Sequence, residues 1–396
     1  MVKISIVATH PIQYHIPWFT ALSNRPDLQV RVYFCYQPDG QQQGVGFGHA
    51  FEWDIPMYDG YEWQVLDSKN RDPGTAGFFS SSVCNMVDVL RRDRPDVMIL
   101  TGWQALPLIQ ALWACIRLRI PRLVRGESSG LKPRGSLVRL IHRLLLSRFD
   151  AFLVIGKANQ EFYNGYGIPE SKLFGCPYFV ENKRLLEQAK DHRVERHMLR
   201  ARWQIPQQSV CYLYIGKLTH KKRVLDQLAA LKRAILVNPR LHLLIVGTGE
   251  LIEQAMRFAE AHHLPVTFAG FLNQTEITSA YVAADCLIIS SDYDETWGLA
   301  ANEAMVCGLP VIVSDRAGCS MDLVRRGRTG EIFPFGEIDT LSNLMVSMAG
   351  DPGRLIKMGE HARDLVLLEY SPEMAVEGTV RAAEAVLGRG RFFDAR

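Results

Sequence analysis

Short apolar runs alternate with amphipathic helical patterns along most of this 396-residue chain. Neighbouring parallel strands need a crossover segment between them, and a helix usually supplies it. The alternation therefore predicts parallel sheets of βα units, and each half of the chain is long enough for one doubly wound α/β domain. The expected strands cover 4–8, 30–36, 97–100, 122–124 and 152–155 in the first half, and 210–215, 241–246, 266–269, 286–289 and 311–313 in the second.

A charged stretch within 181–208, which ends at Ile205-Pro206, marks the join between the two halves. We expect an N-terminal domain at 1–185, a linker with the first helix of the second domain at 186–208, and a C-terminal domain at 209–371. Ser371-Pro372 interrupts the last helical stretch, so 372–396 is expected to return to the first domain as a C-terminal helix. The other expected helices cover 107–118, 136–147, 223–237, 249–262, 273–283, 299–307 and 338–370.

Hydrophobic residues make up 47% of the chain and charged residues 22%, as in a globular protein. No apolar run approaches the ~18–20 residues of a membrane-spanning helix, and the N-terminus lacks the features of a signal peptide. The eight cysteines are scattered without a zinc-like spacing. These features predict a cytoplasmic protein with reduced, mostly packed thiols.

Residues 117–148 contain nine Lys or Arg side chains and a single acid, Glu127. Within this segment, 137–148 has the pattern of a basic amphipathic helix. Two interpretations stay open: an ordinary surface helix, or a helix that lies on the anionic inner face of the cytoplasmic membrane. No aromatic-interleaved basic pattern accompanies the charge, so nucleic acid is not an expected partner.

Residues 37–80 depart from the βα rhythm, since they are rich in glycine and aromatic residues and longer than most loops. So many aromatic residues argue against disorder. The segment is expected either to form a wall of an acceptor pocket or to be a surface excursion without a role in binding.

Glycines and lysines follow the expected strands of the second half. The carboxyl ends of parallel strands meet at one edge of a sheet, where open α/β sheets bind their ligands. Lysine side chains at that edge can neutralise phosphate groups. The residues concerned are Gly216-Lys217-Leu218 with Lys222 after the strand at 210–215, Gly247-Thr248-Gly249 after the strand at 241–246, and Gly270-Phe271 after the strand at 266–269.

Two carboxylates, Glu295 and Glu303, flank the turn before the expected helix at 299–307. The first turn of a helix offers unpaired N–H groups to an anion, and a carboxylate on each side can accept hydrogen bonds from hydroxyl groups. This arrangement suits a nucleotide diphosphate sugar, with the sugar on one side of the diphosphate and the ribose on the other. The intervening residues are Thr296-Trp297-Gly298-Leu299-Ala300-Ala301-Asn302.

These motifs resemble the nucleotide-binding domain of the family-4 retaining glycosyltransferases of bacterial type. The resemblance covers about 210–330 in register and includes the E-x7-E motif from Glu295 to Glu303, followed by Ala304-Met305 and Gly308-Leu309-Pro310. The first half resembles the family more loosely, through its opening Thr9-His10-Pro11-Ile12-Gln13-Tyr14-His15. The resemblance implies a GT-B fold: two facing Rossmann-like domains with parallel sheets and a cleft between them.

The resemblance also implies roles for individual residues. Lys217, where the family usually has Arg, and Lys222 would hold the donor diphosphate; the Lys loses the bidentate fork of Arg. Glu295 would orient the donor sugar, and Glu303 would take the ribose hydroxyls. The other donor-binding residues would be Gly216, Gly247, Gly249, Gly270, Phe271, Trp297, Gly298, Leu299 and Ala300, with the amides of 298–300 facing the phosphates.

The first domain departs from the family in two places. Many members have a Gly-Gly loop where this chain has His10-Pro11-Ile12-Gln13, and many have a histidine where it has Arg125-Gly126-Glu127. Arg125 or Glu127 is therefore a candidate for the place of that histidine. Glu127 is either a proton acceptor for the acceptor hydroxyl or a member of a structural salt bridge. His10, Gln13 and His15 are the candidates on the acceptor side, although a single histidine is more often a packed side chain.

The function that these expectations support is metal-independent, retaining transfer of a hexosyl group from a nucleotide diphosphate sugar to an acceptor hydroxyl. Polysaccharide or lipid-linked glycan synthesis is the expected setting, and a small-molecule acceptor stays open. Lys217, Lys222 and Glu295 are the expected catalytic residues, with Arg125 and Glu127. No cofactor is expected beyond the co-substrate, and Asp292-Tyr293-Asp294 does not form a metal-binding loop. A sugar-nucleotide epimerase or hydrolase, and a non-enzymatic sugar-nucleotide-binding scaffold at the membrane, are the alternatives.

Overall fold

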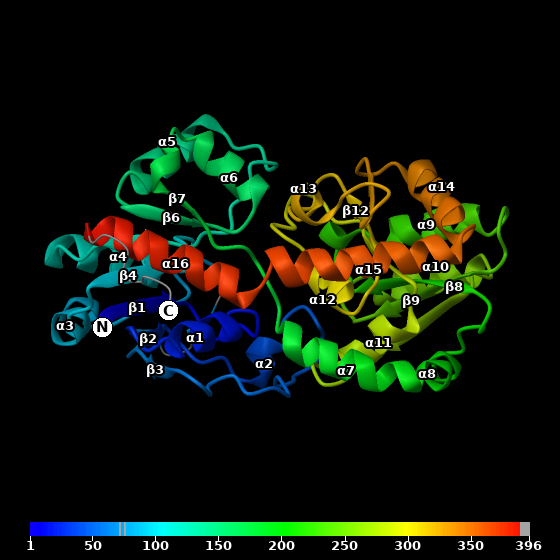
Figure 1. The fold of residues 1–396 in the computed structure, drawn as a ribbon, viewed down its shortest axis with the longest axis horizontal. Coiled ribbons are helices and arrows are strands. Elements are labelled where there is room, and N and C mark those ends of the chain that lie inside the picture. The colour runs from blue at the N-terminus through cyan, green and yellow to red at the C-terminus, as the bar shows by residue number, and fades with distance from the viewer. Residues whose placement is uncertain (71–72, 75–76, 389–396) are drawn as a thin grey trace. The chain divides into compact units, whose positions relative to one another are not determined.

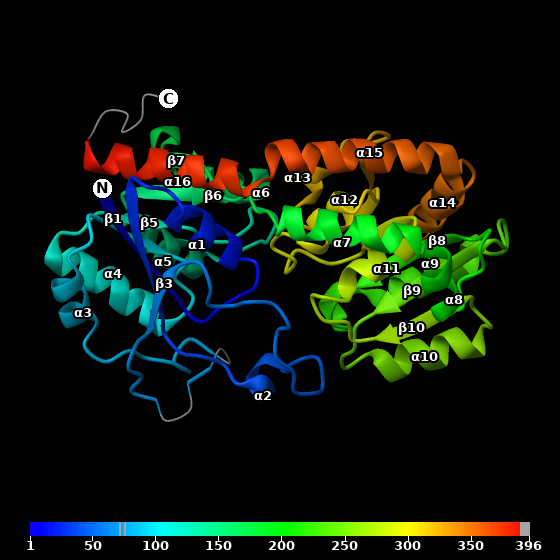
Figure 2. The same cartoon turned by 60° about the horizontal axis from the view of Figure 1, so that its bottom comes forward.

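The computed structural model describes residues 1–70, 73–74 and 77–388, and the chain divides into two compact units. Unit 1 comprises Met1–Gln43, Pro56–Tyr178 and the chain from Pro372, and unit 2 comprises Gly44–Ile55 and Phe179–Ser371. In each unit, helices cover both faces of a central sheet (Figures 1 and 2). The last part of the expected C-terminal helix, 389–396, lies outside the described residues.

The sheet of unit 1 is parallel, with strand order β3-β2-β1-β4-β5-β6-β7. Two of its inner strands, 97–100 and 151–154, consist only of buried apolar residues, as expected for a sheet that helices cover on both sides. The strands are β1 (Val2–Ala8), β2 (Leu28–Phe34), β3 (Glu62–Val65), β4 (Val97–Leu100), β5 (Arg122–Val124), β6 (Ala151–Val154) and β7 (Leu173–Gly175).

The helices of unit 1 include one from the end of the chain. Helix α16 (Pro372–Leu387) packs on β6 and β7 and on α1 (Ile16–Ser23), where the Trp18 indole donates a hydrogen bond to the Thr379 hydroxyl at 3.2 Å. The other helices are α2 (Gly40–Gln43), α3 (Met86–Asp93), α4 (Leu106–Leu118), α5 (Ser136–Leu146) and α6 (Lys157–Asn164), with a 3-10 turn at Glu170–Lys172.

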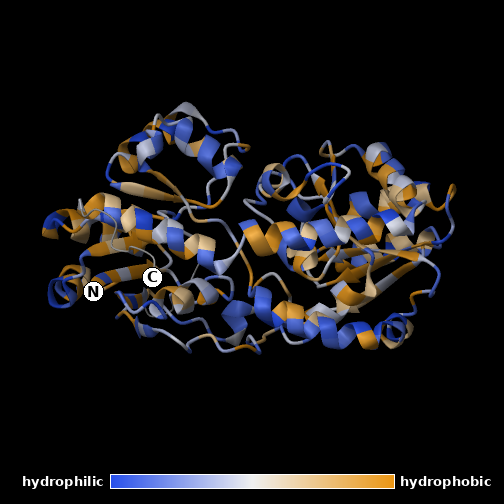
Figure 3. Ribbon diagram, viewed as in Figure 1, coloured by the Kyte–Doolittle hydropathy of each residue, from blue (hydrophilic) through white to orange (hydrophobic). Residues whose placement is uncertain are grey.

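The sheet of unit 2 is also parallel, with strand order β10-β9-β8-β11-β12-β13. The strands are hydrophobic, whereas the surrounding helices show alternating hydrophobic and hydrophilic stretches (Figure 3). The strands are β8 (Val210–Ile215), β9 (Leu241–Val246), β10 (Val266–Gly270), β11 (Cys286–Ile289), β12 (Val311–Ser314) and β13 (Gly330–Phe333).

The helices of unit 2 form two groups. One core cluster joins the sheet to α9, α10, α14 and α15, and contacts elsewhere join α7, α8, α11 and α12. The helices are α7 (Asn182–Val194), α8 (Arg196–Arg202), α9 (Val224–Ala234), α10 (Ile252–Ala261), α11 (Ile277–Ala283), α12 (Ala300–Val306), α13 (Ser320–Leu323), α14 (Ile338–Ala349) and α15 (Pro352–Glu369), with a 3-10 turn at His220–Lys222.

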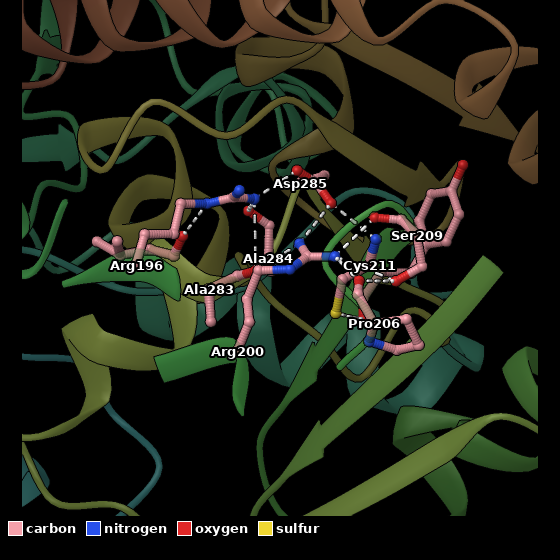
Figure 4. Close-up of polar contacts among 10 residues, drawn as sticks. Arg196, Arg200, Pro206, Ser209, Cys211, Ala283, Ala284 and Asp285 are labelled. Atoms are coloured by element: carbon pink, nitrogen blue, oxygen red, sulfur yellow. Dashed lines mark hydrogen bonds and ion pairs between the residues drawn. The ribbon is translucent and has the colours of Figure 1, made fainter. Parts of the chain in front are cut away.

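An ion-pair network around the buried Arg200 side chain fixes the end of this sheet at which β8 and β11 begin (Figure 4). The Arg200 side chain is 1% exposed and donates to Asp285 at 3.2 Å and to the Ser209 carbonyl at 2.7 Å. Asp285 in turn accepts from the Cys211 amide at 2.8 Å and from Arg196 at 2.6 Å. The network therefore ties α8 to the first residues of two central strands.

The structure differs from the sequence-based expectations in a few elements. Strands β3, β7 and β13 were not expected: β3 is an exposed edge strand inside the irregular 37–80 segment, and the other two are short. The helix expected at 338–370 is two helices, because Gly350-Asp351-Pro352 interrupts it. The chain passes between the units at Tyr178 and Phe179 rather than at 185, and Gly44–Ile55 lies in unit 2 although its neighbours lie in unit 1.

Candidate functional site

Three loops at the carboxyl edge of the unit 2 sheet pack backbone against backbone. Gly247, after β9, has φ +121°, and a Cβ atom there would lie 2.1 Å from the Gly216 carbonyl oxygen. Its amide donates to the Gly270 carbonyl at 2.7 Å, and a Cβ atom on Gly249 would lie 2.8 Å from the Leu218 amide nitrogen. Side chains at 247 and 249 would therefore separate the loops after β8, β9 and β10.

The ammonium group of Lys222 and the carboxylate of Glu295 form an ion pair at this edge. The loops that carry them are tied together, because the Asp292 amide donates to the Lys221 carbonyl at 3.0 Å and the Ser290 hydroxyl donates to the Lys222 carbonyl at 2.9 Å. Burial favours the neutral form of Glu295, but the Lys222 charge and hydrogen bond outweigh it and hold its pKa below the usual value. Glu295 is therefore ionised at neutral pH.

Lys217 reaches the segment Gly44–Ile55, which we call the strap. Its ammonium donates to the Val45 carbonyl at 2.6 Å and lies 4.5 Å from the centre of the Phe47 ring. The Tyr214 hydroxyl donates to the Lys217 carbonyl at 2.8 Å, so the backbone of this lysine is held as well. Burial and the charges of Lys221 and Lys222 lower the pKa of Lys217.

The strap also contacts Phe271, which follows β10. The Phe271 ring lies 4.6 Å from the Phe51 ring and 5.1 Å from the Phe47 ring, measured between centroids. The strap, which is part of the segment 37–80, therefore packs on the loops of unit 2 that carry predicted donor-binding residues. The reason is local: the strap carries the aromatic rings that cover Phe271.

Glu303 lies on α12 and is 1% exposed. The hydroxyl of Tyr281, on α11, donates a hydrogen bond to its carboxylate at 2.6 Å. Sequence reasoning missed Tyr281, since a tyrosine on an apolar helix indicates a core residue. No sequence signal shows that its hydroxyl points to Glu303.

The turn before α12 holds Trp297, a predicted donor-binding residue. Its side chain is 3% exposed and donates to the Asn302 side chain at 2.7 Å. Its ring also lies 5.9 Å from the Tyr370 ring. Gly298 has φ +106°, and Leu299 and Ala300 follow it as α12 begins. The helix spans seven residues, so its N-terminus supplies only a weak dipole to an anion.

In unit 1, candidate residues of the acceptor side lie close together in the first loop and in the loops after β5 and β7. The Arg125 guanidinium is buried between the rings of Tyr178, at 4.3 Å, and Trp18, at 5.1 Å. The Glu127 carboxylate accepts a hydrogen bond from the Tyr178 hydroxyl and lies 3.8 Å from Nε2 of His15. Nδ1 of His15 and two guanidinium nitrogens of Arg125 are buried without a hydrogen-bond partner among the described residues.

The charge states of this cluster follow from its contacts. Desolvation favours neutral Glu127, but the nearby His15 ring, the hydrogen bond from Tyr178 and the charge of Arg125 lower its pKa. Burial lowers the pKa of His15, and the nearby Glu127 carboxylate offsets this lowering only in part. At neutral pH, Glu127 is therefore an anion and His15 a neutral imidazole.

His10 and Gln13 lie in the same first loop but outside this network of contacts. The His10 ring lies 5.3 Å from the Tyr36 ring, and its Nδ1 lies 3.0 Å from the Thr9 hydroxyl. Burial lowers its pKa to about 4, with a smaller contribution from His15. Gln13 is partly buried two residues before the His15 cap of α1. His10 therefore has the contacts of a packed, neutral side chain.

Metal-ligand clusters and membrane-spanning helices are both absent from the described part of the chain. Among the described residues, no three His, Cys, Asp or Glu side chains are grouped as metal ligands would be. None of their helices combines the length and apolar character that a membrane crossing requires.

Comparisons with known proteins agree with this architecture. The chain of Anabaena HepE in complex with UDP superposes with a TM-score of 0.73 over 97% of this chain and 100% of that one, at 15% identity. The chain therefore has the GT-B fold, as the sequence predicted.

The similarity to a family comes from sequence. Residues 195–365 match the family model of the glycosyl transferases group 1. A Mycobacterium tuberculosis glycogen synthase is 28% identical over 171 residues, which are 43% of this chain and 41% of that protein. A GDP-mannose-dependent alpha-mannosyltransferase from the same organism is 30% identical over 266 residues, 64% of each chain. The chain thus spans about two fifths of the glycogen synthase it matches, and its residues 195–365 carry its similarity to the glycosyl transferases group 1.

Proposed function

We propose that this protein transfers a sugar from a nucleotide diphosphate sugar to an acceptor hydroxyl and retains the anomeric configuration. The observation that carries the proposal is the Lys222–Glu295 ion pair at the carboxyl edge of the unit 2 sheet, close to Lys217 and to the glycine-built loops. Cations and a hydroxyl-accepting carboxylate at one sheet edge are the groups that a diphosphate and a sugar require.

In this proposal Lys217 and Lys222 neutralise the diphosphate as it leaves, so that the charge formed on its oxygens is stabilised. Glu295 accepts hydrogen bonds from the donor sugar, and Glu303 accepts them from the ribose. The two lysines supply the positive charge that a divalent metal gives in other enzymes. We therefore expect transfer without an added metal, and a divalent requirement that persists after chelator controls would contradict this expectation.

The acceptor side of the proposal uses the cluster of unit 1. Glu127 is ionised, 39% exposed at its side chain, and held by Tyr178 and His15. An ionised, partly exposed carboxylate of this kind can accept a hydrogen bond or a proton from an acceptor hydroxyl. The HepE structures contain UDP, glucose and UDP-glucose, which makes a uridine donor the first to test here.

A thermal-shift screen of nucleoside diphosphates and their sugars tests the donor site. The nucleoside diphosphate with one particular base should raise the melting temperature of the protein. An activity assay with the corresponding sugar nucleotide should then show acceptor-dependent release of that nucleoside diphosphate. Release without an acceptor would indicate a hydrolase, and interconversion of the sugar an epimerase. Binding without turnover over a broad acceptor panel would favour the scaffold.

We propose in addition that unit 1 contacts an anionic membrane surface through α5. The apolar side chains Leu137, Leu140, Ile141 and Leu144 are 71, 53, 52 and 58% exposed and lie at helical spacing. The polar His142 instead faces the unit, with Nδ1 3.1 Å from the Tyr166 hydroxyl. The helix thus presents its apolar side to solvent.

Exposed basic residues lie on and next to α5, and their charge indicates the kind of partner. Lys132, Arg139, Arg143 and Arg148 are exposed. An apolar stripe flanked by cations suits the interface of an anionic bilayer, and a lipid-linked or polysaccharide acceptor would be reached from there.

Co-sedimentation with phosphatidylcholine vesicles, with and without phosphatidylglycerol, tests the surface. The protein should bind the anionic vesicles and release them as salt rises. Leu140→Asp with Leu144→Asp should abolish binding. Leu236→Asp with Val237→Asp is the matched control, since these side chains are 84 and 72% exposed in unit 2. Equal binding by both double variants would contradict the proposal.

A further inference from the structure

The strap approaches Lys217 through a turn that its glycines make possible. The Phe47 amide donates to the Gly44 carbonyl at 2.8 Å, and Gly46 and Gly48 have φ of +84° and +80°. These left-handed conformations suit glycine, and they bring the Val45 carbonyl and the Phe47 ring to the same ammonium. A Cβ atom on Gly46 would lie 3.0 Å from Cδ of Lys217, so the turn fits closely against the lysine stem.

The far end of the strap is fastened independently. The Asn273 side chain donates to the Glu52 carbonyl at 2.7 Å, and the Asp54 carboxylate accepts from the Thr275 amide at 3.2 Å and from the Thr275 hydroxyl. Between the two ends, Phe51 packs on Phe271. The contacts of the strap thus fall on the loops after β8 and β10, which flank β9 in the sheet.

A lysine needs such support more than an arginine does. Its ammonium ends a flexible stem with four carbons, whereas the guanidinium of Arg is a planar fork that is ordered before it binds. In this protein, one N–H of Lys217 binds the Val45 carbonyl and one side of the ammonium meets the Phe47 ring. An ammonium has three N–H groups, so these contacts fix its position and leave donors for an anion.

The surroundings of Lys217 point to the class of that anion. Lys221 and Lys222 lower its pKa through their charges, so three cations share this part of the sheet edge. Among the described residues, Glu295 has Lys222 as its ion-pair partner. A group with two or more negative charges, such as a diphosphate, relieves this repulsion better than a single carboxylate does.

We propose that the strap is a working part of the donor site, in which Val45 and Phe47 are positioning residues that hold the Lys217 ammonium ready for the donor diphosphate. The inference rests on the proposed function. It assigns the strap to donor binding rather than to acceptor binding.

A double-mutant cycle on the full-length protein tests the inference, with the affinity for the nucleoside diphosphate that binds best as its readout. Phe47→Leu keeps the apolar volume but removes the ring, and it should weaken binding about 3- to 10-fold. Phe47→Trp, which keeps a ring face, should restore it. In a Lys217→Met background, Phe47→Leu should change affinity less than about twofold, because the cation that the ring holds is gone.

Two further variants separate positioning from folding. Phe258→Leu is the matched control, since Phe258 is another partly buried phenylalanine of unit 2 and its ring contacts His262 at 4.7 Å. It should leave affinity unchanged. Gly46→Ala should weaken binding as Phe47→Leu does, because its Cβ would displace the strap from the lysine stem.

The outcomes distinguish the inference from the function on which it rests. If the unmodified protein binds no nucleoside diphosphate, the proposed function is wrong and the strap has no donor to serve. If it binds one but Phe47→Leu binds equally well, the inference alone is wrong. An equal loss from Phe47→Leu in the unmodified protein and in the Lys217→Met background would also overturn it, since it would show that Phe47 supports the fold of the site and not the lysine.

Discussion

Lys222 and Glu295 form an ion pair that joins the loop after β8 to the loop after β11, two neighbouring strands of the unit 2 sheet. The side chains of Lys222 and Glu295 are 23 and 13% exposed, so the pair is mostly buried but still accessible to water. In the proposed reaction Lys222 and Glu295 contact different parts of the donor, because the diphosphate attracts Lys222 while sugar hydroxyls donate to Glu295. The pair therefore keeps both charges in place when no donor is bound.

Replacement of Glu295 should separate transfer from nucleotide binding. Glu295→Ala removes the acceptor for sugar hydroxyls, so kcat/KM should fall on the order of 100-fold or more. Affinity for the nucleoside diphosphate alone should stay the same or rise, since Lys222 is freed from its partner. Acceptor-dependent release of nucleoside diphosphate and calorimetric titration measure the two effects. Full activity of the Ala variant would contradict the assignment of Glu295.

The role proposed for Glu303 predicts a preference for ribose. The carboxylate is buried and oriented by the Tyr281 hydroxyl. We expect the protein to bind a ribonucleoside diphosphate more tightly than its 2′,3′-dideoxy analogue, by about 10-fold or more. Glu303→Gln and Tyr281→Phe should both reduce this ratio, the first more than the second.

A measured ratio near one in the unmodified protein would remove Glu303 from the ribose site. Tyr212→Phe is a useful control for Tyr281→Phe. Tyr212 is also a buried tyrosine of unit 2, and its hydroxyl donates to the Met345 carbonyl at 2.6 Å. It should lower stability without changing the ratio.

The sequence predicts most of the fold because strand ends and helix breaks have local causes. The strands β4, β5, β8, β9 and β11 have the same bounds as the ranges predicted from the sequence. The same locality places Gly216, Gly247 and Gly270 at one sheet edge, since parallel strands share the direction of their carboxyl ends. Edge strand β3 was missed because an exposed strand lacks an apolar run.

The parts of the site that the sequence does not predict depend on long-range contacts. Lys217 and Val45 are 172 residues apart, and nothing in the Gly-rich segment indicates which unit it joins. The buried contacts of the Trp297 indole were unpredictable for a related reason, because an indole near a binding motif looks the same in sequence whether it faces a ligand or the core. The hydrogen bond from Tyr178 to Glu127 is likewise not predictable from the sequence, because it forms only when the fold brings the loops after β5 and β7 together.

The Arg200–Asp285 network should affect stability and not the donor site. It lies where β8 and β11 begin, whereas Lys217, Lys222 and Glu295 follow the ends of these strands. Arg200→Met leaves Asp285 with only Arg196 as an ionic partner among the described residues, and the free energy of unfolding should fall by about 3 kcal/mol. Chemical denaturation measures the loss, and affinity for the nucleoside diphosphate per folded molecule should not change.

The pair Glu127 and His15 predicts a pH profile for the acceptor side. The pKa of Glu127 is lowered, so Glu127 is fully deprotonated at any pH at which an ordinary glutamate is deprotonated. The pKa of His15 is lowered from 6.5, so its imidazole is neutral at and above that pH. If Glu127 accepts the proton of the acceptor hydroxyl, kcat/KM should stay level from pH 6.5 upward, until another group titrates, and should fall only under acidic conditions.

Glu127→Gln, which keeps the shape of the side chain, should lower kcat by about 100-fold or more while leaving donor affinity unchanged. Tyr178→Phe removes only one hydrogen bond to the carboxylate and should move the acidic limb of the profile to higher pH, because that bond favours the ionised form. A structural salt bridge makes a different prediction: Glu127→Gln would then lower the melting temperature and leave the kcat of the folded protein intact. The two readouts, kcat and melting temperature, thus decide between the base and the salt bridge.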